Sequence, residues 1–132
     1  MSDVRLRSEE RLKSRKQLST LFEEGRSTVA FPLRFVWMRA DQAGTYPVRV
    51  AFSVSRKNWR KAVDRNLLKR RMREAYRLNK HLLYDAGLPT GRQLLLVCLY
   101  TANVKSAFEQ VQTGMCKGLK RIAAQLSQTT EM

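Results

Sequence analysis

The sequence is poor in the residues that carry most protein-based catalysis and metal binding. Its 132 residues include one histidine and two cysteines. Cys98 and Cys116 both lie among apolar neighbours and form no CxxC pair, which indicates neither a disulfide framework nor a metal-ligand cluster. His81 follows a basic stretch near the end of a predicted helix, and we expect it to be exposed. We find no carboxylate pair and no nucleophile with a base, so we assign no catalytic residue and no metal site.

Long apolar runs are also missing. No segment approaches the roughly 18 apolar residues that a membrane-spanning helix needs. The polar, acid-containing start, MSDVRLRSEERLKS, does not look like a secretory signal. We therefore expect a cytoplasmic protein with no membrane partner.

Acidic residues are scarce relative to basic ones. The chain has 11 Asp and Glu against 26 Lys and Arg, a formal net charge of +15. A field of that size favours association with a polyanion such as nucleic acid. The length suits one core and is too short for two comfortable domains. We expect a single domain over residues 1–132, with a core from about 9 to 126 and flexible ends at 1–8 and 127–132.

The first half of the chain predicts one helix and two strands. The helix is expected to begin after Ser14, whose side chain can cap the backbone at Gln17, and to stop at Gly25. Segments 31–40 and 46–55 alternate apolar and polar residues, as half-buried strands do. Because turn-forming residues join them, we expect an antiparallel hairpin.

The second half predicts a helix, a strand and a helix. Segment 61–80 reads as a basic helix, which DAGLPTG interrupts with two glycines and a proline. The apolar run QLLLVCLY predicts a central strand covered on both faces. Ser106 and Glu109 are spaced as a capping box for a C-terminal helix, whose apolar side recurs every three or four residues. The resulting fold class is α+β: an α/β sandwich of order α-β-β-α-β-α, with a central sheet of three to four strands.

The helix at 61–80 is predicted to combine an apolar side with a cationic one. Residues 56–80 hold 11 of the 26 basic residues and two acids. Like charges four residues apart oppose helix formation, so a polyanion that neutralises them explains the row better than simple solvation does. On the phase of an ideal helix, the apolar side comprises Leu67, Leu68, Met72, Ala75, Leu78 and Leu82, and the cationic side comprises Arg65, Asn66, Lys69, Arg70, Arg73, Arg77 and Lys80.

Three residues near this helix need separate expectations. Arg71 projects toward the apolar side, so it must either extend its head to solvent or find a partner. Trp59 is expected to pack on the core or its own loop, and RNA contact is the alternative. Lys105 is far along the chain, and we expect its replacement with alanine to have little effect on RNA affinity.

The context of the basic helix favours RNA over DNA. A helix-turn-helix protein needs a partner helix and a tight turn before its recognition helix. Here the segment VRVAFSVS, a predicted strand, comes first. Recognition of phosphates and shape suits folded RNA, whose major groove is too narrow for side chains to read.

The segment AVDRNLLKRRMRE resembles the RNR motif of the bacterial ribonuclease P protein family. The similarity extends through RLKSRKQLSTLFEEG and AFSVSRK and covers about residues 9–125. It implies an α/β sandwich with a left-handed βαβ crossover, although the general rule for such units favours the right-handed form. The six motif positions are occupied by Ala62, Arg65, Asn66, Lys69, Arg70 and Arg73.

The resemblance implies the protein subunit of ribonuclease P, an endoribonuclease that removes the 5′ leader from precursor tRNA. The expected partners are the catalytic RNA, with one protein per RNA, and precursor tRNA. The RNA with Mg²⁺ would perform the cleavage. The alternative is a ribosomal or ribosome-associated RNA-binding protein without a nuclease role.

The resemblance also implies residue roles. The leader would lie in a cleft between the first helix and the sheet, lined by Leu18, Phe22, Arg34 and Val36. Leu18 replaces an aromatic that is usual in the family, and on the residues alone core packing is the simpler explanation of Leu18 and Phe22. RNA contact would involve Arg65, Asn66, Lys69, Arg70 and Arg73, supported by Arg56, Lys57 and Arg77.

Overall fold

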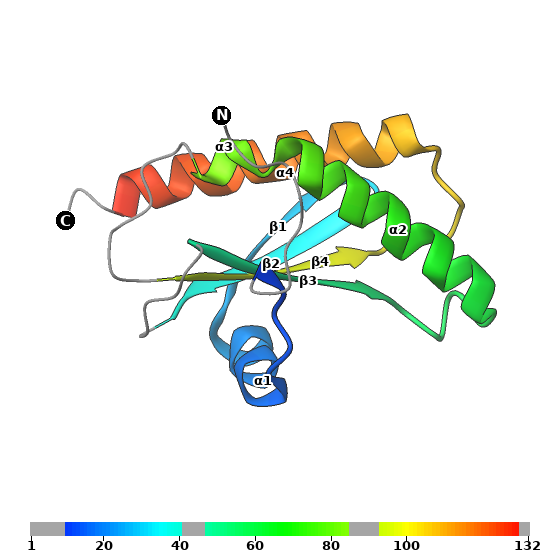
Figure 1. Cartoon of the computed structure of the whole chain (residues 1–132), viewed down its shortest axis with the longest axis horizontal. Helices are drawn as coiled ribbons and strands as arrows, with labels where there is room; N and C mark the ends of the chain where they lie inside the picture. Colours follow the sequence, from blue (N-terminus) through cyan, green and yellow to red (C-terminus); the bar gives the residue numbers. More distant parts are fainter. Residues whose placement is uncertain (1–9, 41–46, 85–92, 130–132) are drawn as a thin grey trace.

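The computed structural model of the chain describes residues 10–40, 47–84 and 93–129. These residues form one four-stranded sheet with helices on both faces (Figure 1). The elements are α1 (Arg15–Glu24), β1 (Arg26–Ala30), β2 (Leu33–Arg39), β3 (Val48–Val54), α2 (Ala62–Asn79), α3 (His81–Tyr84), β4 (Leu94–Tyr100) and α4 (Phe108–Thr129).

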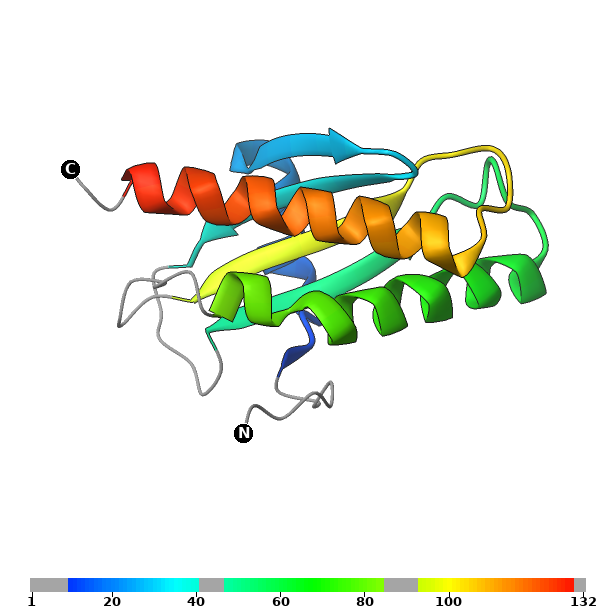
Figure 2. The same cartoon turned by 90° about the horizontal axis from the view of Figure 1, so that it is seen from above.

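The sheet has the order β1-β2-β4-β3 (Figure 2). β4 is antiparallel to β2 and parallel to β3. α2, α3 and α4 cover one face, and α1 lies on the other (Figure 1). Seen from the helix side, α2 lies in front of the sheet, and β4 lies to the left of β3 when both strands are turned to point upward (Figure 2). The β3–α2–β4 crossover is therefore left-handed, as the family resemblance implied.

The predicted hairpin between segments 31–40 and 46–55 is wrong. β4 lies between these two strands, because its apolar residues can be buried on both faces of the sheet. The hairpin partner of β2 is β1, an edge strand that the sequence reading missed. Its sequence, RSTVA, is short and mostly polar, and three of its five residues are exposed.

Two apolar clusters hold the layers together. The larger one lies between the sheet and the pair α2 and α4, and it includes Phe35, Tyr76 and Leu119. The smaller one lies under α1 and includes Leu21 and Val97. Residues of β4 contribute to both clusters, which confirms the predicted central strand.

The helix ends agree with the sequence at α1 and differ at α4. Ser14 Oγ accepts a hydrogen bond from the Gln17 N–H at 3.2 Å, and α1 ends before Gly25, as predicted. The capping box at Ser106 and Glu109 is wrong: the Ala107 N–H donates instead to the side chain of Gln110 at 3.1 Å.

The apolar side of α4 is confirmed: Phe108 is half-buried, and the residues that follow it at intervals of three and four are buried, namely Val111, Met115, Leu119, Ile122 and Leu126. The helix continues to Thr129, past the expected core limit at 126. The interruption at DAGLPTG and the expected flexible end at 1–8 lie outside the described residues.

Arg71 and Trp59 both find partners within the protein. The Arg71 guanidinium donates to the Ser106 carbonyl at 2.5 Å, which ties α2 to the start of α4. Trp59 Nε1 donates to the Ala102 carbonyl at 3.1 Å, and its ring meets Tyr100 edge to face. The packing alternative for Trp59 is therefore confirmed. In the part of the chain that the structure describes, no helix is long and apolar enough to span a membrane.

Candidate nucleic-acid interface

α2 presents its cations along the outer side of the helical layer. Leu68, Met72, Ala75 and Tyr76 are buried beneath it, and α4 packs alongside (Figure 2). Because residues three or four apart share a side of a helix, burial of this set turns the intervening cations outward. Asn66 and Arg70 are exposed, and Arg65, Lys69, Arg73 and Arg77 are half-buried.

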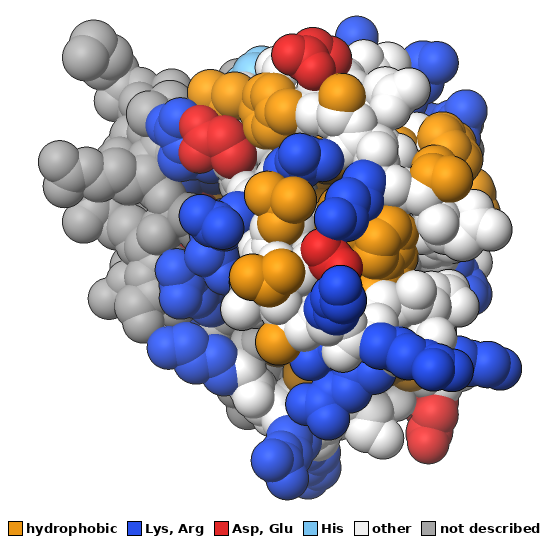
Figure 3. Space-filling view, turned by 90° about the vertical axis from the view of Figure 1, so that its right-hand side faces the viewer, with side chains coloured by type: hydrophobic (Ala, Val, Ile, Leu, Met, Phe, Trp, Pro, Cys, Tyr) orange, Lys and Arg blue, Asp and Glu red, His pale blue; other side chains and the backbone are white. Residues whose placement is uncertain are grey.

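The turn before α2 adds to the same surface. Arg56 and Lys57 are exposed and lie just beyond Ser55, which follows the end of β3. Figure 3 shows the end of the molecule at which α2 begins: Lys and Arg side chains spread across this face, with few acidic groups among them. The structure thus brings all eight residues of the predicted RNA surface onto α2 or the turn that leads into it.

Lys80 was placed on the cationic side wrongly. Its side chain is buried, with 5% exposure of the residue, and Nζ lies 2.9 Å from Glu10 Oε2. The buried side of α2 is centred on Met72 and continues to Asn79, whereas Leu78 is exposed. The true phase differs from the predicted one at the end of the helix, where the chain turns from α2 into α3.

Both acids of α2 are ion-paired with a base. Asp64 Oδ1 lies 2.8 Å from Lys105 Nζ, so Lys105 lies beside α2 although it is distant in sequence. Glu74 Oε2 accepts from Arg77 Nε at 3.0 Å, and this hydrogen bond holds the pKa of Glu74 below its usual value. The acids are therefore satisfied within the protein and do not neutralise Lys69, Arg70 or Arg73.

Arg65 has a structural role besides its charge. Its Nη1 donates to the carbonyls of Trp59 at 2.8 Å and Arg60 at 2.7 Å. Lys61, the residue that precedes α2, makes no side-chain capping bond. Arg65 thus fastens the turn before the helix and fixes the position at which the cationic surface begins.

The other sheet face carries the residues assigned to the leader cleft. Phe22 on α1 is 53% exposed, Leu18 is half-buried at the edge of the smaller cluster, and Arg34 on β2 is exposed. Val36 is only 4% exposed, because α1 covers it. Val36 can therefore support a cleft from below but offers little surface for contact.

Strand register extends this open face beyond the predicted residues. Arg34 is paired with Leu99 on one side and Val29 on the other, and Leu99 is paired with Ser53. Since alternate residues of a strand share a face, these side chains form a row on the α1 side of the sheet. Val29 is 59% exposed, and the sequence reading missed it because it missed β1.

The described residues hold no group of three His, Cys, Asp or Glu placed to bind a metal ion. Cys98 is fully buried in β4, and desolvation raises the pKa of its thiol well above the usual range. Thiolate is the reactive form of cysteine, so Cys98 contributes to core packing and is not a reactive residue.

Comparison with known proteins supports the resemblance that the RNR motif suggested. A family model described as Ribonuclease P matches residues 6–123. The ribonuclease P protein component of Porphyromonas gingivalis is 37% identical over 118 residues, which cover 89% of this chain and 86% of that protein. The corresponding protein of Chlorobaculum tepidum is 35% identical over 130 residues, which cover 90% and 84%.

Solved structures of RNase P proteins also resemble this chain. The RNase P protein from Thermotoga maritima aligns with a TM-score of 0.60 at 27% identity, covering 85% of this chain and 96% of that one. The RNase P protein of Staphylococcus aureus aligns with a TM-score of 0.61 at 21% identity, covering 86% and 94%, and this likeness concerns the fold alone. From the family match and the relatives in sequence, the chain belongs to the ribonuclease P protein family.

Proposed function

We propose that this protein is the protein subunit of ribonuclease P, which binds the RNA subunit and assists it in removing the 5′ leader of precursor tRNA. The observation that carries the proposal is the uncompensated cationic side of α2, in a chain whose relatives are named ribonuclease P protein components. The proposal includes one protein per RNA and a cytoplasmic location.

The α2 surface would act mainly through phosphate neutralisation. Each phosphate that a lysine or arginine neutralises releases condensed counterions, which makes binding favourable and sensitive to salt. We assign direct contacts to Asn66, Lys69, Arg70 and Arg73. Arg73 Nε is buried without an acceptor among the described residues, and an RNA oxygen would satisfy it once the side chain turns outward to the RNA.

The other residues of the predicted surface would contribute less directly. Arg56 and Lys57 strengthen the field from the turn before α2. Arg65 places the start of the helix through its bonds to Trp59 and Arg60. Arg77 is partly neutralised by Glu74.

A single-stranded leader would follow the open face beside α1. The exposed ring of Phe22 offers a surface for base stacking, which contributes about 1–3 kcal/mol per base in single-strand binders. Arg34 would contact a phosphate, and Leu99 and Val29 extend the row on either side of it. Leu18 and Val36 would support this face from beneath.

In this proposal the RNA subunit, with Mg²⁺, performs the cleavage. Mg²⁺ binds chiefly to carboxylate and phosphate oxygens, and the described residues offer it no cluster of acids. We therefore assign the ion to the RNA. The protein neutralises phosphates where RNA subunit and substrate approach each other, and so lowers the Mg²⁺ concentration that the complex needs.

The test is reconstitution with a cognate ribonuclease P RNA. At low Mg²⁺, adding the protein should raise the rate of precursor-tRNA cleavage, and the gain should be larger for a substrate with a leader of several nucleotides than for one with a single-nucleotide leader. No gain in rate would contradict the proposal. Retention on ribosomal RNA without any preference for leader-bearing substrates would favour a ribosome-associated protein instead.

Removal of individual charges should affect RNA binding unequally. Arg70→Ala and Arg73→Ala should each weaken binding of the RNA subunit and reduce the slope of log K against log salt by about one unit. Binding isotherms at four or five salt concentrations measure both quantities. The matched control is Arg15→Ala, an exposed arginine on α1 in the opposite layer. Equal losses at all three positions would mean that net charge alone binds the RNA.

A further inference from the structure

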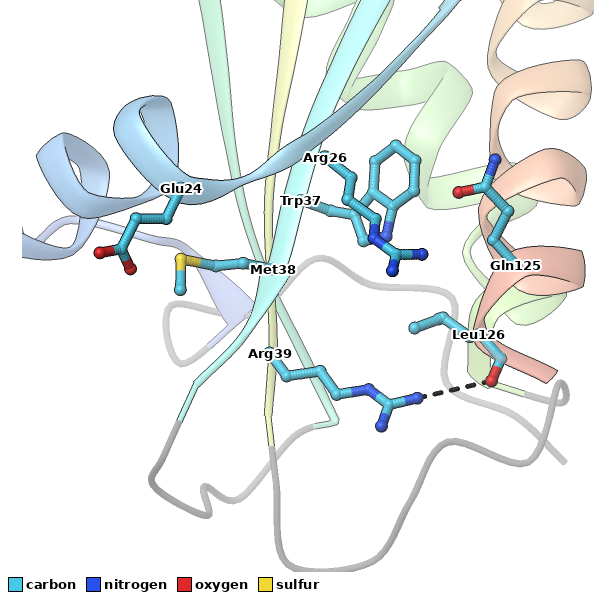
Figure 4. A pocket seen from close by; sticks show the side chains of 7 residues that line it. All are labelled: Glu24, Arg26, Trp37, Met38, Arg39, Gln125 and Leu126. Carbon is cyan, nitrogen blue, oxygen red and sulfur yellow. Dashed lines mark hydrogen bonds between the residues drawn. The ribbon is translucent and has the colours of Figure 1, made fainter. Parts of the chain in front are cut away.

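A second group of basic side chains surrounds a pocket that the proposed function does not use. The pocket has a volume of about 250 Å³ and lies between the end of β2 and the C-terminal half of α4 (Figure 4). Arg26, Trp37, Arg39 and Gln125 line it. α4 separates this side of the molecule from α2 (Figure 2). The pocket is therefore not an extension of the α2 surface.

Strand register explains why these side chains converge. Arg26 of β1 is paired with Trp37 of β2, and Arg39 follows Trp37 by two residues, so all three lie on the α4 side of the sheet. Figure 4 shows the two guanidinium groups and the indole nitrogen turned toward one space, with Gln125 across from them on α4. Met38 and Glu24 also border the pocket, but they lie on the other side of the β2 ribbon (Figure 4).

Trp37 has an indole N–H that faces the pocket and finds no acceptor among the described residues. The residue is only 3% exposed, and within the described residues its Nε1–H makes no hydrogen bond. Trp59 is different, since its Nε1 donates to the Ala102 carbonyl at 3.1 Å. Among the described residues this nitrogen is not one of the fully buried unpaired atoms, so a water or a ligand in the pocket can reach it. The unpaired indole N–H thus points to an acceptor group that enters this pocket.

The surrounding charge specifies the kind of acceptor. Arg26 is exposed and has no hydrogen bond or ion pair within the described residues. Arg39 Nη2 donates to the Leu126 carbonyl at 3.4 Å, which holds the guanidinium at the wall of the pocket (Figure 4). An indole N–H and two guanidinium groups offer donors and positive charge and no acceptor. The complementary ligand is an anion with several oxygen acceptors.

We propose that this pocket binds a phosphate group, supplied either by an RNA strand or by free inorganic phosphate. Its volume of about 250 Å³ falls below the roughly 300–1,000 Å³ of sites for drug-sized ligands, which suits one phosphate better than a whole dinucleotide. A guanidinium group can donate two parallel N–H hydrogen bonds to two oxygens of one phosphate. The Trp37 N–H supplies a further donor at a fixed position.

The course of α4 favours an RNA strand as the source. Lys117 and Arg121 precede Gln125 at intervals of four residues, so they lie on the same side of the helix. Both are exposed, and Arg121 donates to the Val29 carbonyl of the edge strand β1. A line of cations therefore leads along the junction of α4 and β1 to the pocket. A strand held there would meet the protein on the side opposite α2.

The experiment follows the indole N–H of Trp37 directly. The chain has two tryptophans, so a ¹H–¹⁵N spectrum of the free protein shows two indole signals, and Trp59→Phe identifies which one belongs to Trp37. Inorganic phosphate, sodium acetate and a short single-stranded RNA are titrated separately at constant ionic strength set with chloride. We expect the Trp37 signal to shift in a saturable way with phosphate and RNA, and not with acetate.

Two variants and one control sharpen the test. Arg26→Gln should weaken binding measured at Trp37 by a factor of about ten, because a hydrogen bond to a charged group is lost. Trp37→Phe keeps an aromatic side chain, although a smaller one, and removes the N–H donor, and RNA binding measured by salt titration should lose affinity without a change in slope. Arg15→Gln removes an equal charge elsewhere and should leave the Trp37 shift unchanged.

The outcomes distinguish RNA from inorganic phosphate as the source of the phosphate group, and they test this site separately from the proposed function. A shift with phosphate but none with RNA would assign the pocket to the free anion. A signal that moves no more with phosphate than with chloride, or equally with acetate, would overturn the proposal. None of these readouts uses ribonuclease P RNA or cleavage. The phosphate site can therefore be confirmed even if the proposed function is wrong, and it can be wrong even if the proposed function is confirmed.

Discussion

Replacing Glu10 with glutamine is expected to lower the free energy of unfolding by about 3 kcal/mol, because removing one partner of a buried ion pair leaves the other charge uncompensated. Glu10 is fully buried and accepts from Lys80 Nζ at 2.9 and 3.1 Å. The Tyr84 hydroxyl also donates to this carboxylate, and Lys80 Nζ lies 5.5 Å from the centre of the Tyr84 ring. These contacts fasten the start of the described chain to the end of α2.

Urea denaturation followed by circular dichroism measures this effect, because the free energy of unfolding falls linearly with urea. Glu23→Gln is the matched control, since Glu23 is exposed on α1 and its loss should change stability by less than about 0.5 kcal/mol. The double replacement Glu10→Gln with Lys80→Met should recover much of the loss, because an apolar side chain replaces the unpaired charge. A Glu10→Gln protein as stable as the parent would show that the pair contributes nothing.

Local patterns predicted most helices and strands correctly, and non-local contacts explain what they missed. The cap at Ser14, the stop at Gly25 and the apolar run of β4 depend on neighbours in sequence, so they could be read directly. The pairing of β2 with β4 depends on which strand can be buried on both faces of the sheet. A turn-like connection between two strands carries no information about a third strand that inserts between them.

The same distinction between local patterns and non-local contacts applies to the candidate interface. The spacing of Arg65, Lys69, Arg70 and Arg73 placed them on one helix surface, and the structure keeps them there. Lys80 follows the same spacing but is buried, because its partner Glu10 lies 70 residues earlier in the chain. The pocket beside Trp37 is also invisible in sequence, since it combines β1, β2 and α4.

Gly118→Ala is expected to destabilise the protein by about 3 kcal/mol, the upper end of the usual cost of overpacking. In an isolated helix this substitution would be stabilising by about 1 kcal/mol, because alanine is the better helix former. Here a Cβ at position 118 would lie 2.0 Å from Phe35 Cε2 and 2.4 Å from Phe35 Cζ. Phe35 is fully buried against α4 in the larger cluster, so its ring cannot move without displacing other core residues. The steric clash therefore destabilises the protein, whereas the change in helix propensity alone would stabilise it.

Urea denaturation of the parent and four variants decides whether Gly118→Ala stabilises or destabilises the protein. Ala124→Gly on the exposed side of α4 should cost about 1 kcal/mol and calibrates the propensity difference in this helix. Phe35→Leu should make room for the new methyl group, so the double variant Gly118→Ala with Phe35→Leu should be more stable than the sum of the single changes predicts, as expected for residues in contact. Gly118→Ala with stability equal to or above that of the parent would mean that α4 can move away from the sheet. In that case the close approach of α4 to Phe35 would not be what requires glycine at this position.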